Sequence, residues 1–301
     1  MRECMNAKMQ KINISAPGKL ILLGEHAVVY GYPCIVTAVN RHLTARVSFS
    51  EGKDDVVVTP EVSDQSFIKE AIKIFRNQFN KKQPIHIETK SEIGAYGLGS
   101  SAATVVATMK ALLQLFKIKI NSKTLFDLCY KAVLNVQGVG SGYDVAAAIY
   151  GGTLYFAQKG KIIESLSTDN IPLVVGYSGV KADTVSQINL VHKKLKNYKE
   201  GVEKIFENIA KLVNEAKQII NNKDWARLGT LMNYNEDYLG NLGVSTEKLN
   251  SMILAARKAG AYGAKLSGAG GGDCMIALVS KETENQVREA ITCVGGQIVK
   301  I

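Results

Sequence analysis

A run rich in glycine and serine stands directly before a helical pattern in this chain. It reads Gly-Ala-Tyr-Gly-Leu-Gly-Ser-Ser-Ala-Ala-Thr and covers residues 94–104. From Val105 the bulky apolar residues recur at steps of three and four, which predicts a helix with one buried face. The first N–H groups of a helix lack partners and its N-terminus carries partial positive charge, so a phosphate group binds well there. The run therefore predicts a phosphate-binding loop.

This loop differs from the common nucleotide-binding fingerprints. No Gly-Lys-Ser/Thr closes it at the spacing of a P-loop, and its glycines do not have the spacing of a dinucleotide site. Taken alone, an ordinary turn with a serine N-cap would explain the run equally well. If the loop holds phosphates, we expect them to contact the backbone and hydroxyl groups of Gly97, Leu98, Gly99, Ser100, Ser101 and Ala102.

Length and cysteine content restrict the class of protein. The chain has 301 residues, 46% of them hydrophobic, which allows one large domain or two of ordinary size. Its five cysteines are odd in number and form no Cys-x-x-Cys pair, which argues against a disulfide framework or a zinc site and favours a reducing cytoplasm. Residues 1–11 lack the apolar core of a signal sequence and are expected to be a frayed leader, and no later run is long enough to span a membrane.

The formal net charge of +10 raises the question of nucleic acid. However, the lysines are scattered, or interleaved with glutamates over residues 181–223, which is typical of solvated helix faces. No aromatic and basic motif of the known nucleic-acid-binding modules is present. We therefore expect no nucleic-acid partner, and the charge suits a small anionic substrate equally well.

The hydrophobic pattern predicts a sheet-rich first part and a helix-rich second half. Short β-branched or alternating runs predict strands at 12–14, 20–23, 34–39, 43–49, 55–59 and 85–89, with one helix at 65–80. Helices are predicted at 102–116, 122–135 and from 143, before a strand at 152–157. Beyond Pro172 the pattern predicts a strand at 173–177, one long helix at 184–221, helices at 225–239 and 246–259, and strands at 264–267, 274–279 and 296–300 around a short helix.

Two further segments carry motifs. Residues 15–31 read Ser-Ala-Pro-Gly-Lys-Leu-Ile-Leu-Leu-Gly-Glu-His-Ala-Val-Val-Tyr-Gly, and residues 265–274 read Lys-Leu-Ser-Gly-Ala-Gly-Gly-Gly-Asp-Cys. In this order and at these spacings, the three segments resemble the GHMP kinase family over nearly the whole chain. The resemblance implies an α+β fold of two domains. Residues 1–165 would form an N-terminal α/β domain with a left-handed crossover, and residues 166–301 a C-terminal ferredoxin-like domain.

The resemblance also implies ATP bound over the glycine-serine loop and a loop at 268–272 that borders both substrates. Four glycines within those five residues make the backbone unusually permissive, which is expected where something approaches it closely. Gly270 and Gly271 are expected to contact the acceptor substrate. A long hairpin loop without a ligand is the alternative.

Phosphoryl transfer to an alcohol requires an oriented hydroxyl, an acceptor for its proton and cations near the moving phosphoryl group. By resemblance, Asp144 orients or deprotonates the hydroxyl, and Lys19 pairs with Asp144. Asp144 would otherwise be explained as a helix N-cap, and Lys19 as a lysine that snorkels from a strand end.

Other expected site residues have weaker local signals. Glu25 and His26 are expected to line the acceptor pocket, although a polar surface turn explains such a pair almost as well. Thr184 resembles a family threonine near the active site, and capping of the helix that follows it is an equally good account. Ser101 is expected to be the hydroxyl ligand of Mg²⁺.

One expected metal ligand is missing. Mevalonate kinases, one branch of the family, usually carry a glutamate eleven positions before the catalytic aspartate, where this chain has Val133. No carboxylate lies in residues 131–139. The metal would therefore rely on Ser101, ATP oxygens, water and Asp144, which agrees with the tendency of Mg²⁺ to keep its waters.

Two branches of the family compete as the nearest match. Residues 24–31 resemble mevalonate kinases, whereas residues 137–152 and the pair Asp273-Cys274 look more like phosphomevalonate kinases. The favoured expectation is ATP-dependent phosphorylation of the primary hydroxyl of mevalonate in isoprenoid precursor synthesis. Phosphomevalonate kinase, another GHMP kinase for a small alcohol, and an inactive homologue that senses ATP and a sugar are the alternatives. The sequence leaves the oligomeric state open, with a homodimer among the options.

Overall fold

The computed structural model describes residues 11–60, 64–168 and 171–301. These residues form two compact units. Of the described residues, unit 1 comprises those within 11–19, 39–94 and 98–151, and unit 2 comprises those within 20–38, 95–97 and 152–301. The leader expected at 1–11 lies outside the described residues apart from Lys11. The domain limits expected at 165 and 166 stay a prediction, because a division by contacts need not follow the domains of a family.

Two long strands, β1 (Ile12–Leu23) and β2 (Cys34–Phe49), continue from one unit into the other. Each had been predicted as two shorter strands. Pro17 does not interrupt β1, because within the described chain β1 pairs with β2 alone and a proline is tolerated on an edge strand. In unit 1, β2 pairs antiparallel with β4 (Ile85–Ser91), and β4 pairs in parallel with the short strand β3 (Val56–Val58).

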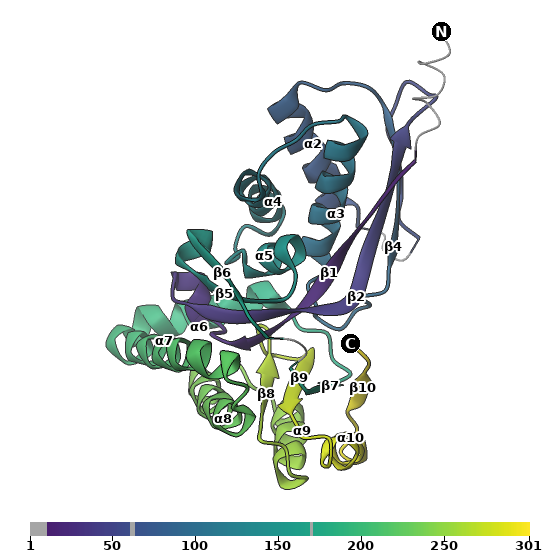
Figure 1. Cartoon of the computed structure of the whole chain (residues 1–301). Coiled ribbons are helices and arrows are strands. Elements are labelled where there is room, and N and C mark those ends of the chain that lie inside the picture. Colours follow the sequence, from purple (N-terminus) through teal and green to yellow (C-terminus); the bar gives the residue numbers. More distant parts are fainter. Residues whose placement is uncertain (1–10, 61–63, 169–170) are drawn as a thin grey trace. The chain divides into compact units, whose positions relative to one another are not determined.

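Four helices of unit 1 lie on one side of this sheet, as Figure 1 shows: α2 (Ser66–Phe79), α3 (Ser100–Leu115), α4 (Ser122–Gln137) and α5 (Tyr143–Tyr150). Helix α3 packs against the other three and is buried along most of its length, which explains its largely apolar sequence. Helix α2 connects the parallel strands β3 and β4. The left hand of that crossover stays a prediction.

Unit 2 contains an antiparallel sheet in the order β10-β7-β9-β8, made of β7 (Leu173–Tyr177), β8 (Gly263–Ser267), β9 (Cys274–Leu278) and β10 (Gln297–Val299). Helix α9 (Glu247–Lys258) precedes β8, and α10 (Glu284–Cys293) connects β9 to β10. Counted in chain order, the strands are arranged 4-1-3-2, which is the ferredoxin-like arrangement that the resemblance implies. This sheet holds the glycine loop between two of its paired strands, β8 and β9.

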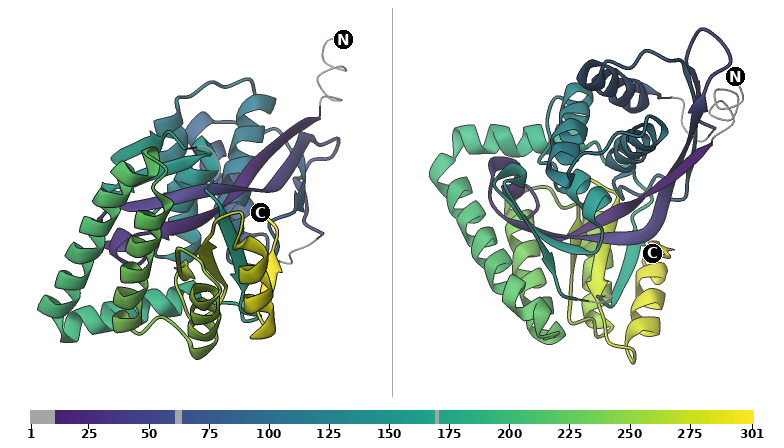
Figure 2. Two further views of the ribbon diagram at one scale, coloured as in Figure 1. Left: turned by 60° about the horizontal axis from the view of Figure 1, so that its bottom comes forward. Right: turned by 45° about the horizontal axis from the view of Figure 1, so that its top comes forward.

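The prediction of one long helix at 184–221 is wrong. The chain forms α6 (Thr184–Asn197) and α7 (Lys199–Asn221), because Tyr198 between them has φ −137° and ψ 53°, outside the helical region. Helix α8 (Trp225–Leu242) then lies along α7, as both views of Figure 2 show in green. A strand that was not predicted, β6 (Ile162–Leu166), pairs with β5 (Thr153–Ala157).

Two expectations drawn from composition can be compared with the described residues. Among them, no helix is both long and apolar enough to cross a bilayer. The described cysteines are free thiols; three are buried and Cys293 is exposed. The absence of a disulfide framework from the whole chain stays a prediction, because Cys4 lies outside the described residues.

Candidate active site

The glycine-serine loop leads into α3 as predicted, and the helix begins two residues earlier, at Ser100. Its N-cap is Gly99, in the left-handed conformation with φ 81°, so the alternative of a serine N-cap is wrong. Glycine supplies no capping side chain. An anion placed at the positive end of the helix can therefore accept hydrogen bonds from the N–H groups of the first helical turn.

Lys19 lies against this loop. It belongs to the part of β1 in unit 1 and is only 6% exposed. Its backbone N–H donates to Leu98 O at 2.8 Å, and a Cβ placed on Gly99 would lie 2.9 Å from Lys19 Cγ and 3.2 Å from Cε. The lysine side chain thus requires glycine at position 99. A lysine that snorkels would be exposed, so that alternative is wrong.

Asp144 is the second residue of α5, whose N-cap is Gly142, so the N-cap explanation of Asp144 is wrong. Its Oδ1 accepts the N–H of Val145 at 2.9 Å. Burial raises the pKa of Asp144 above its ordinary value, while the charge of Lys19 and the Val145 hydrogen bond act in the opposite direction. Unit 1 therefore places a carboxylate of increased basicity within the field of the lysine that packs against the glycine-serine loop.

Two tyrosines next to Asp144 were not predicted as site residues. The Lys19 Nζ lies 5.6 Å from the centroid of the Tyr143 ring, within the range of a cation–π contact. The Tyr130 hydroxyl donates to Gly140 O at 2.9 Å, and its pKa is raised by burial and by the charge of Asp144. Tyr130 stands on α4, so only the packing of α4 on α5 reveals its relation to Asp144.

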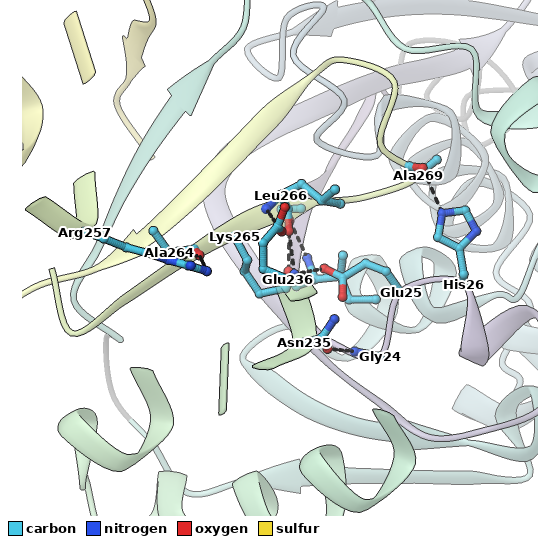
Figure 3. A network of polar contacts seen from close by, with 12 residues as sticks. Gly24, Glu25, His26, Asn235, Glu236, Arg257, Ala264, Lys265, Leu266 and Ala269 are labelled. Carbon is cyan, nitrogen blue, oxygen red and sulfur yellow. Dashed lines mark hydrogen bonds and ion pairs between the residues drawn. The ribbon is translucent and has the colours of Figure 1, made fainter. Parts of the chain in front are cut away.

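In unit 2, Glu25 follows Gly24 at the end of β1 and is 1% exposed. It forms an ion pair with the fully buried Lys265 of β8, whose ammonium also donates to Leu266 O (Figure 3). On α8, Glu236 accepts the N–H of Leu266 at 2.8 Å, and its pKa is raised, mainly by burial. A polar surface turn at Glu25 and His26 is therefore wrong, since both side chains are buried.

The turn itself is tied to the glycine loop. His26 has φ 60°, a strained value for a residue with a side chain. Its Nε2 lies 2.9 Å from Ala269 O, and because a carbonyl only accepts, we assign the ring proton to Nε2 (Figure 3). Burial lowers the pKa of His26 to about 4, with the charge of Lys265 acting in the same direction. Gly24 N–H donates to Asn235 Oδ1 at 3.1 Å and fixes the other end of the turn.

The glycine loop at 268–272 packs inside unit 2, and Gly270 and Gly271 are needed for close contact with protein. A Cβ on Gly270 would lie 2.9 Å from the backbone carbon of Val244, and one on Gly271 would lie 2.7 Å from Gln187 Cδ. Both glycines have φ above 70°, so the loop needs glycine for its conformation as well.

Thr184 is exposed and begins α6, three residues before Gln187. The alternative that Thr184 caps this helix is wrong, because Asp183 is the N-cap and accepts the N–H of Ser186 at 3.1 Å. The structure thus brings together His26, the glycine loop and the first turns of α6 in unit 2. In unit 1 it brings together Lys19, Asp144 and residues 98–102.

The described residues contain no group of three or more His, Cys, Asp or Glu side chains able to hold a metal ion by themselves. Val133, where a second metal carboxylate was missing from the sequence, is 1% exposed on α4. Ser101 stands in the first turn of α3 with a partly accessible side chain. This donor set fits Mg²⁺ only when nucleotide oxygens and water complete the shell, which is the usual manner of Mg²⁺ binding in kinases.

Comparison with known proteins agrees with this geometry. Residues 66–152 match the family model of the GHMP kinases N terminal domain, and residues 216–297 match that of the GHMP kinases C terminal domain. The two matched segments include Asp144 and the glycine loop. They also include α3, which follows the glycine-serine loop.

Individual relatives extend the likeness to most of the chain. It is 37% identical to the mevalonate kinase of Thermococcus sibiricus over 95% of this chain and 94% of that protein, and 40% identical to the mevalonate kinase of Pyrococcus horikoshii over 94% and 92%. The crystal structure of L. major mevalonate kinase in complex with R-mevalonate superposes with a TM-score of 0.81 at 26% identity, covering 93% of this chain and 91% of that one. The chain therefore belongs to the GHMP kinase family, and within it to the group of relatives named mevalonate kinase.

Proposed function

We propose that this chain transfers the γ-phosphoryl group of ATP to the primary hydroxyl of mevalonate, producing 5-phosphomevalonate and ADP. One observation carries the proposal: Lys19 contacts the phosphate loop at Leu98 and Gly99, while its charge acts on the carboxyl group of Asp144. A single cation thus interacts both with the loop where ATP would bind and with the carboxyl group that would accept the proton of the alcohol. The acceptor is proposed from the relatives of 37–40% identity that are named mevalonate kinase.

At the donor side, the N–H groups of residues 97–102 would donate hydrogen bonds to the phosphate oxygens at the positive end of α3. Lys19 would hold this loop in position through its backbone and its side chain. Because the lysine is buried, its charge is screened less by water than that of a surface lysine. The loop would therefore be preorganised for a polyanionic ligand.

At the acceptor side, Asp144 would accept the hydroxyl proton as the alcohol oxygen forms its bond to the γ-phosphorus. The bond from that phosphorus to the bridging oxygen breaks in the same in-line step, and ADP leaves without a phosphoenzyme. Burial makes Asp144 a stronger base than a solvated aspartate, and Lys19 favours its ionised form. The two residues thus have complementary roles.

Mg²⁺ would be held by the Ser101 hydroxyl with nucleotide oxygens and water, and would neutralise phosphate charge. For the acceptor pocket we propose His26, Thr184, Gly270 and Gly271. Glu25 is proposed to support that pocket through its ion pair with Lys265, which fixes the conformation of the turn that carries His26.

A second candidate acceptor is 5-phosphomevalonate. It is favoured by the sequence at residues 137–152 and by the pair Asp273-Cys274, which resemble phosphomevalonate kinases. We place the reaction in the cytoplasm, since the described cysteines are free thiols. A homodimer is the assembly to be tested, by measurement of the mass in solution.

The test is ADP release with Mg·ATP, with mevalonate and 5-phosphomevalonate offered separately and homoserine and galactose as control alcohols. Turnover on mevalonate alone is expected. The Asp144→Asn variant should lose about a hundredfold or more in turnover while it still binds ATP, because it keeps its size and loses its basicity. Turnover on 5-phosphomevalonate alone would replace mevalonate by the second candidate, and no turnover on any of these alcohols would contradict the proposed activity.

A further inference from the structure

Asp273 links the glycine loop of unit 2 to the segment that precedes α6. It follows Gly272 and has φ 56°, a left-handed conformation that is strained for an aspartate. Its N–H donates to Val180 O at 2.7 Å, and its carbonyl accepts the N–H of Ser178 at 2.9 Å. Its carboxylate Oδ1 accepts the N–H of Ala182 at 3.1 Å. Backbone and side chain together hold residues 178–182.

The same carboxylate packs against the beginning of the phosphate loop. Gly97 belongs to unit 2, and a Cβ added to it would overlap the Asp273 carboxylate and lie 2.7 Å from Asp273 Cβ. Such overlap is not tolerated without movement of one of the two segments. Gly97 also has φ 73°, so both its conformation and its surroundings require glycine.

Neighbouring contacts hold the residue before Gly97. The Cys274 thiol donates to Tyr96 O at 3.2 Å, and the Tyr96 ring makes an edge-to-face contact with Tyr177 at a centroid distance of 5.2 Å. Tyr177 and Cys274 are directly paired across β7 and β9. Residues 96–97 therefore rest on the end of one strand and the beginning of another, with Asp273 at their centre.

On electrostatic grounds alone, an aspartate at this position is unfavourable for the binding of phosphate groups. An ionised carboxylate next to a loop for phosphates repels the ligand. The charge of Asp273 also acts on the neighbouring Tyr177, whose pKa is raised mainly by burial and further by this charge. The contacts of Asp273 with Gly97 and Ala182 depend on its shape and on one acceptor oxygen, which an asparagine also has.

From these contacts we infer that Asp273 is a positioning residue for ATP, which sets the phosphate loop through Gly97 and ties it to residues 178–182. The inference rests on the proposed function in that ATP is the ligand of the loop. It assigns to Asp273 no contact with the substrates. Its effect passes through Gly97, so the two residues should be energetically coupled.

The first test is a double-mutant cycle on Mg·ATP binding, measured by calorimetry without an alcohol. Gly97→Ala is expected to weaken binding about tenfold, as a displaced loop loses the energy of about one hydrogen bond to phosphate. In the Asp273→Gly background the same change should weaken binding only about twofold, because no side chain remains at position 273 to overlap the added Cβ. If Gly97→Ala lowers the affinity for Mg·ATP by the same factor in both backgrounds, the inference is overturned.

Gly152→Ala is the matched control for backbone strain. Gly152 has φ 62° and belongs to unit 2 outside residues 178–182, and nothing stands within 4 Å of an added Cβ. We expect it to change ATP affinity less than about twofold in either background, since strain alone does not move the phosphate loop. An effect as large as that of Gly97→Ala would mean that strain and not the Asp273 contact governs binding.

A second pair of variants leaves Gly97 unchanged. Asp273→Asn keeps the size and the acceptor oxygen and should retain at least about half of the affinity for Mg·ATP, whereas Asp273→Ala should lose about tenfold. If both lose affinity equally, the charge of Asp273 is what matters and the positioning role is refuted. Because no alcohol is present, these results stand whether or not the protein phosphorylates mevalonate.

Discussion

The ammonium of Lys19 opposes the effect of burial on the carboxyl group of Asp144. Burial raises the pKa of Asp144, and the lysine charge lowers it again. The same lysine also packs against Gly99 of the glycine-serine loop, which we propose binds the phosphates of ATP. A change at Lys19 is therefore expected to affect both the basicity of Asp144 and the binding of ATP, which a change at Asp144 alone would not do.

Lys19→Met should move the acid limb of the pH profile of kcat/KM to higher pH. Without the ammonium, the pKa of Asp144 rises further, so the carboxylate form needed as base appears only at higher pH. The rate at the optimum should fall about a hundredfold, as for loss of one preorganised charge in other active sites. The measurement is a profile of ADP release against pH.

Lys131→Met serves as the control for that profile. Lys131 is exposed on α4 in the same unit, and its removal should leave the acid limb where it is. An acid limb that stays in place in Lys19→Met as well would show that the lysine does not set the basicity of Asp144.

Gly99→Ala should impair ATP binding and turnover together. Its Cβ would meet the Lys19 side chain at 2.9 Å, and φ 81° is unfavourable for alanine. We expect the KM for ATP to rise about tenfold, since the loop or the lysine must move. Gly138→Ala is the matched control, with φ 75° and open space around the added Cβ, and should cost only about 1 kcal/mol of stability. Equal kinetic effects of the two variants would contradict the explanation.

Lys265→Met should destabilise the protein by about 3–5 kcal/mol, because it leaves Glu25 buried without its cation. Urea unfolding monitored by circular dichroism measures the loss. Adding Glu25→Gln should recover part of it. Lys204→Met removes one member of the exposed pair with Glu207 and should leave the midpoint unchanged. If the urea midpoint of Lys265→Met is as close to that of the wild type as the midpoint of Lys204→Met, the buried ion pair is dispensable for stability.

Local pattern was sufficient wherever a feature depends on neighbours in the sequence. Helix α2 was predicted within one residue at each end, and β7 with the bounds that the structure has. The glycine-rich entry into α3 was predicted as well, because helix periodicity and the glycine-serine run both lie within about 20 residues. The break at Tyr198 was missed, since apolar residues continue at helical spacing on both sides of it.

Contacts between distant residues had no such signal. Lys265 was visible only as the first residue of a motif, and its partner Glu25 lies 240 positions away. The contact of Asp273 with Gly97 was equally hidden, because the sequence explains both glycines and acidic residues in loops by turn formation alone. The family resemblance indicated which segments matter, whereas packing decided that Glu25 would be buried as the counter-ion of a lysine.

Stability should fall on acidification in a manner that depends on His26. Its pKa is lowered to about 4 in the folded protein, against 6.5 as the ordinary value, mainly by burial. Between these pH values the unfolded chain binds a proton that the folded chain does not, so stability is lost as the pH falls through the window, by up to about 3 kcal/mol. In His26→Gln the side chain can still donate to Ala269 O, and this part of the loss should disappear. Urea unfolding at several pH values between 4 and 7 measures how the stability of the variant and of the wild type depends on pH. Asp144 and Glu236, whose pKa values are raised, contribute a dependence of the opposite sign, so the comparison isolates the contribution of His26.

His192→Gln is the control, because His192 is exposed on α6, and it should keep the pH dependence of the wild type. The same pH dependence in His26→Gln would mean that the buried imidazole is not what destabilises the protein in acid.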